Sequence, residues 1–136
     1  MSECWRIRSF AVAGEMFGVI SQGWDGACYR VRTAGFEATF MVGGDEQPHA
    51  VENVDAEVVL SDGSRWGATI VTVAEVQRLM KRWAGTGECA GGSYFWCSDG
   101  VVVRDPGVAT MTRVLTALHD ADTLRSALHR LAEPSE

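Results

Sequence analysis

The spacing of hydrophobic residues divides the chain into a first half that predicts strands and a second half dominated by helices. In the first half, short runs rich in aromatic and β-branched residues alternate with glycines, which is typical of strands joined by turns. These runs predict strands over residues 5–12, 16–21, 27–32 and 36–42.

A stronger strand signal follows at residues 54–71. The runs 54–60 and 65–71 flank an Asp-Gly turn at residues 61–64. Such a turn suits the twist of a hairpin, because few residues other than Gly, Asn and Asp tolerate the positive φ that it demands. These runs predict an antiparallel hairpin.

The clearest helix begins directly after this hairpin. Thr72 can cap its first turn, and Glu75 stands where a capping box requires an acid. Gly85 and Gly87 are expected to end it. Its apolar residues recur at helical spacing along one face, with the basic residues off that face. The apolar face consists of Val73, Val76, Leu79, Met80 and Trp83, and the basic residues are Arg78, Lys81 and Arg82.

Three further elements complete the pattern. Residues 92–97 and 101–104 are nearly continuous apolar runs around a second Asp-Gly turn, so we expect this hairpin in the centre of the sheet. Asp105-Pro106 predicts the start of another helix, and Asp122 is expected to cap a last one. The buried stripes of these two helices are Val108, Met111, Leu115 and Leu118, then Leu124, Ala127, Leu128 and Leu131.

Strands grouped apart from helices indicate the α+β class. We therefore expect a mostly antiparallel β-sheet of about six to eight strands packed against three helices. A chain of 136 residues fits one domain, spanning residues 1–136.

Charge narrows the range of functions. The net charge of −6 argues against nucleic-acid binding, because that function requires a basic surface to neutralise phosphates. No run is apolar and long enough to span a membrane, and the first residues lack a secretory signal, so we expect a cytoplasmic protein that binds no membrane. Its four cysteines are then expected to be reduced thiols.

The acidic residues are unevenly distributed. Residues 33–64 contain seven acids and no Lys or Arg, and strand alternation puts Asp55 and Glu57 on one face of the predicted hairpin. Two interpretations fit: a solvated face that maintains solubility, or a landing site for a basic partner. The seven acids are Glu37, Asp45, Glu46, Glu52, Asp55, Glu57 and Asp62.

The tryptophans add one candidate contact. Trp66, Trp83 and Trp96 lie within predicted regular elements and are expected in the core. Trp24 lies in a predicted loop beside an acid, where it can anchor an interface or fold back onto the core. The residues that we expect to bind a partner are Trp24, Asp45, Glu46, Glu52, Asp55 and Glu57.

No pattern predicts catalysis. The glycine-rich segment 85–92 follows a predicted helix and precedes a predicted strand, the reverse of a phosphate-binding loop. His49, His119 and His129 share no metal-ligand spacing, and no Gly-x-Ser-x-Gly elbow is present. We expect no catalytic residue, no metal and no cofactor.

One pattern in the second half is shared with other proteins. It consists of Asp62-Gly63-Ser64-Arg65-Trp66, Thr72, Leu79-Met80, Thr86-Gly87-Glu88, Gly91-Gly92-Ser93-Tyr94-Phe95-Trp96 and Asp99. It resembles a group of small bacterial proteins, some of which look like immunity proteins of toxin–immunity and contact-dependent inhibition systems. The resemblance covers residues 54–131, and it implies no particular binding residue, because immunity proteins share no single binding motif.

Charge and resemblance together favour a non-catalytic protein-binding domain, namely a cytoplasmic immunity protein that neutralises a basic toxin domain through an acidic surface. We expect a monomer or a weak homodimer. Two alternatives stay open. One is a small-molecule-binding or enzymatic domain with a pocket between sheet and helices. The other is a self-associating module that pairs through an exposed sheet edge.

Overall fold

A computed structural model describes residues 18–43 and 45–132 of the chain. The predicted strand 5–12 and the beginning of the predicted strand 16–21 lie outside these residues.

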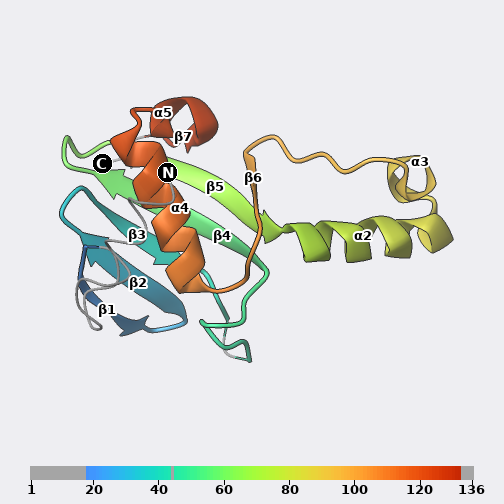
Figure 1. Cartoon of the computed structure of the whole chain (residues 1–136), viewed down its shortest axis with the longest axis horizontal. Coiled ribbons are helices and arrows are strands. Elements are labelled where there is room, and N and C mark those ends of the chain that lie inside the picture. Colours follow the sequence, from blue (N-terminus) through green and yellow to red (C-terminus); the bar gives the residue numbers. More distant parts are fainter. Residues whose placement is uncertain (1–17, 44, 133–136) are drawn as a thin grey trace.

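Within the described residues, the centre of the fold is a seven-stranded sheet (Figure 1). The first five strands follow one another in antiparallel order, as their grouping apart from the helices predicts. The last two strands share one edge of the fifth: β6 pairs with its end in parallel, and β7 pairs with its start in antiparallel. The strands are β1 (Val19–Asp25), β2 (Cys28–Thr33), β3 (Phe36–Phe40), β4 (Asn53–Leu60), β5 (Arg65–Thr72), β6 (Gly100–Val103) and β7 (His129–Arg130).

The predicted hairpin at residues 54–71 is confirmed as β4 and β5. Gly63 has the positive φ of 87° that the turn requires. The carboxylate of Asp62 accepts hydrogen bonds from the Ser64 backbone N–H at 2.8 Å and from the Ser64 hydroxyl at 2.6 Å, which fixes the turn.

The core lies on one face of the sheet, beneath α4 (Val108–Asp120) and α5 (Leu124–Ala127) (Figure 1). Every second residue of β3 and β4 is buried there, as strand alternation predicts. Met111 and Leu115 of α4 are fully buried in the same cluster. These features confirm the α+β class and the predicted stripe of α4.

The boundaries of the last helices differ from the prediction. The helix expected from Pro106 begins at Val108, because Gly107 holds a φ of 102° and an added Cβ would lie 2.6 Å from the His49 carbonyl oxygen. The helix expected after Asp122 is the single turn α5, and its N-cap is Thr123. The chain then extends to form β7 beside β5, so tertiary pairing overrides the helical periodicity.

The prediction of a second hairpin, at residues 92–104, is wrong. β6 forms, but it pairs with β5, and residues 92–97 form no strand. Instead of lying in the centre of the sheet, Tyr94 and Trp96 are 52% and 73% exposed. A continuous apolar run predicts burial but does not identify the surface that will bury it.

The crossover between β5 and β6 has an unusual position. Parallel strands are normally joined by a helix that covers one face of their sheet. Here the crossover helix α2 (Val73–Thr86) projects away from the sheet, with α3 (Glu88–Gly92) at its tip (Figure 1). α2 contains no buried residue, so it does not pack against the sheet as we expected. We refer to residues 73–99 as the arm.

Candidate functional site

The six residues predicted to bind a partner do not form one surface. Trp24 lies in strand β1, and not in a loop as we had expected. It is paired across the sheet with Tyr29 of β2, and Tyr29 is paired with the buried Phe40 of β3. Directly opposed residues point to the same face, so Trp24 shares the face that α4 covers. Asp55 and Glu57 lie on the other face of β4, as the alternation predicted.

Trp24 also has a partner within its own sheet. Its ring is 50% exposed and packs edge-on against Tyr29, with 5.5 Å between ring centroids. The side chain is therefore half covered by the neighbouring strand and stands at the β1 edge of the sheet.

Most carboxylates of the acidic segment pair with arginines from outside it. Four of the seven acids form such pairs, which neutralise much of the local charge. The pairs are Glu37 with Arg30 at 3.7 Å, Glu52 with Arg78 at 2.6 Å, Glu57 with Arg65 at 2.6 Å and Asp62 with Arg125 at 2.9 Å.

Three acids of the segment form no ion pair with a described residue. Asp45 and Glu46 are exposed in the loop before β4. Asp55 is exposed on β4 and accepts a hydrogen bond from the Thr69 hydroxyl at 2.9 Å. The charge available to a basic partner is therefore concentrated on these three side chains.

Glu52 belongs to the root of the arm. Its carboxylate accepts hydrogen bonds from the Thr72 hydroxyl at 2.8 Å and from the Arg78 guanidinium at 2.6 Å, and both hold the pKa of Glu52 below its ordinary value. The Thr72 hydroxyl also accepts from the Glu75 backbone N–H at 3.0 Å, which confirms the predicted N-cap. This network connects the first turns of α2 to the start of β4.

The predicted apolar face of α2 is partly covered by the arm itself. The Phe95 ring stacks on Trp83, with 6.1 Å between ring centroids and 8° between the planes. Gly92 passes so close to α2 that an added Cβ would lie 1.9 Å from the Met80 carbonyl oxygen. The chain thus folds back along its own helix, and the arm has two layers.

The turn at the tip of the arm is left-handed. Cys89 and Ala90 have φ values of 50° and 53°, and Gly87, Gly91 and Gly92 also have positive φ. A residue with a Cβ loses about 1–2 kcal/mol in this conformation. The glycines on either side make the reversal possible, and Gly87 ends α2 as predicted.

The return segment presents aromatic rings to solvent. Exposure alternates along it, so that Phe95 and Cys97 are half-buried while Tyr94 and Trp96 are exposed, as in a strand with one covered face. No backbone hydrogen bond joins residues 94–96 to another described residue. The segment therefore resembles a strand in its exposure pattern, and it pairs with none of the described strands.

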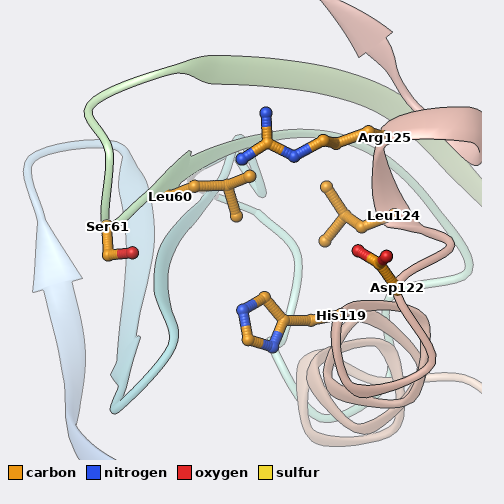
Figure 2. Close-up of a pocket in the computed structure, with 6 residues that line it drawn as sticks. All are labelled: Leu60, Ser61, His119, Asp122, Leu124 and Arg125. Carbon is orange, nitrogen blue, oxygen red and sulfur yellow. The ribbon is translucent and has the colours of Figure 1, made fainter.

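One cavity lies at the end of α4, next to the β4–β5 turn. Figure 2 shows the side chains that line it, and its volume is about 100 Å³. Small-molecule sites are usually about 300–1,000 Å³. Two of its polar side chains already have partners: Arg125 pairs with Asp62 at 2.9 Å, and Nδ1 of His119 lies 3.2 Å from Oδ1 of Asp120. The lining residues are Leu60, Ser61, His119, Asp122, Leu124 and Arg125.

The described thiols and acids do not form a cluster. Cys28, Cys89 and Cys97 are free and partly buried. Within residues 18–43 and 45–132, no three His, Cys, Asp or Glu side chains come together as a metal site would require. None of the helices in that part of the chain has the length and apolar character needed to cross a bilayer.

Comparison with protein-family models, with curated proteins and with solved structures gave no match for this chain. The sequence pattern missed Tyr94 and Trp96 as functional candidates and assigned Trp96 to the core. A signal was present, since three aromatic residues follow Gly91-Gly92-Ser93, where a left-handed turn precedes the run and the run has no hairpin partner among the described residues.

Proposed function

We propose that this protein is a non-catalytic protein-binding domain and that the arm is its main binding element. The observation that carries this proposal is the exposure of aromatic and aliphatic side chains on an element detached from the core. Trp96, Tyr94 and Val73 are 73%, 52% and 46% exposed. Tyrosine and tryptophan are the residues most often found to dominate binding energy at protein interfaces.

The physical cost of the free arm supports a partner. A helix of 14 residues without tertiary contacts is marginal in water, and most helical stability in proteins comes from packing of an apolar face. The arm's own return segment supplies part of that packing, through Phe95 and Gly92. Covering the remaining apolar surface with another protein would supply the rest.

We further propose that the binding serves toxin neutralisation, as in a cytoplasmic immunity protein. The sequence resemblance to such proteins includes residues 91–96, the segment that carries the exposed rings. Asp45, Glu46 and Asp55 form no ion pair with a described residue, so they can attract a basic toxin domain.

Photo-crosslinking tests the role of the arm. Trp96 would be replaced by p-benzoylphenylalanine in cells that produce the protein, with the same replacement of Trp24 as the control. We expect a covalent protein adduct from position 96 and none from position 24. Absence of any adduct from position 96, in a variant with the circular dichroism spectrum of the unchanged protein, would contradict the proposal.

Co-expression tests toxin neutralisation. If the neighbouring gene encodes a secreted protein with a variable C-terminal domain, that domain should arrest growth alone and fail to do so with this protein. Replacing both Asp45 and Glu46 by Lys should weaken the protection, because association with a basic toxin domain slows. Unchanged growth arrest in the presence of the unaltered protein counts against this role.

A further inference from the structure

We draw no further inference here: the strongest candidate, the exposed aromatic surface of the arm around Tyr94 and Trp96, carries none, because nothing in the described part of the chain shows what covers it.

Discussion

Glu52 and Arg78 form an ion pair of 2.6 Å across 26 residues of sequence, and this pair joins the start of β4 to the second turn of α2. The same carboxylate accepts the Thr72 hydroxyl at the helix N-cap. An acid that the sequence assigned to partner binding thus contributes to fixing the direction in which the arm leaves the sheet.

Removing this carboxylate should loosen the arm and leave the sheet unaffected. In Glu52→Ala, we expect faster amide hydrogen exchange over residues 73–78, because the N-cap loses the group that holds the Thr72 hydroxyl. Exchange in β3 and β4 should be unchanged. Glu57→Ala is the matched control, since Glu57 pairs with Arg65 inside the sheet. Equal exchange of the arm in both variants would contradict this role.

Acid should destabilise the fold through two carboxylates. The Ser64 hydroxyl and Arg125 hold the pKa of Asp62 well below its usual range, and Thr72 and Arg78 lower the pKa of Glu52. A carboxyl whose pKa is lower in the folded state stabilises the fold above its unfolded pKa of about 4, and this stabilisation is lost as the pH falls through the folded pKa.

Urea unfolding at neutral pH and at about pH 3 measures this loss. Asp62→Asn should be less stable than the unchanged protein at neutral pH and should lose less stability on acidification. Asp45→Asn, in an exposed loop, is the control and should follow the unchanged protein. Parallel pH dependence of the unchanged protein and Asp62→Asn would argue against this assignment.

A Leu→Ala substitution should lower the free energy of unfolding much more in α4 than in α2. Leu115→Ala in α4 removes a side chain that is 0% exposed, so we expect a loss of about 2–5 kcal/mol in the free energy of unfolding. Leu79→Ala in α2 removes a half-buried side chain outside the core, and we expect about 1 kcal/mol or less at low protein concentration. Equal losses in urea titrations would mean that α2 packs against the sheet.

Two glycine substitutions in the arm should act in opposite directions. Gly92→Ala places a Cβ against the Met80 carbonyl oxygen at a φ of 82°, so the left-handed turn should detach from α2. In Gly85→Ala, the added Cβ meets no atom within 4 Å and the residue is helical. The substitution should therefore stabilise α2 by up to about 1 kcal/mol and raise the helix content. Circular dichroism and tryptophan fluorescence would report both effects. A Gly92→Ala spectrum identical to that of the unchanged protein contradicts the close approach.

Local chemistry explains which elements could be predicted from the sequence. The Asp62-Gly63 turn, the Thr72 cap and the Gly87 stop each depend on residues within four positions of one another, and all three are present. The stripe of α4 was predictable for the same reason, since helical spacing brings Val108, Met111 and Leu115 to one side.

Distant pairing explains what could not be predicted. Residues 33–64 contain no Lys or Arg, yet Arg78 and Arg125 reach Glu52 and Asp62 from 26 and 63 positions away. The apolar run at residues 94–97 predicts burial. The left-handed turn at residues 87–92 instead reverses the chain, so that the run lies along α2 and not in the sheet. A sequence pattern defines which side chains need a partner and leaves open which surface provides it.

Hydrogen exchange of the arm tests the central claim most directly, because that claim is that residues 73–99 form an element detached from the core. We expect rapid exchange over residues 73–99 and slow exchange in β3 and β4. Exchange of the arm as slow as that of β3 and β4 would contradict the claim.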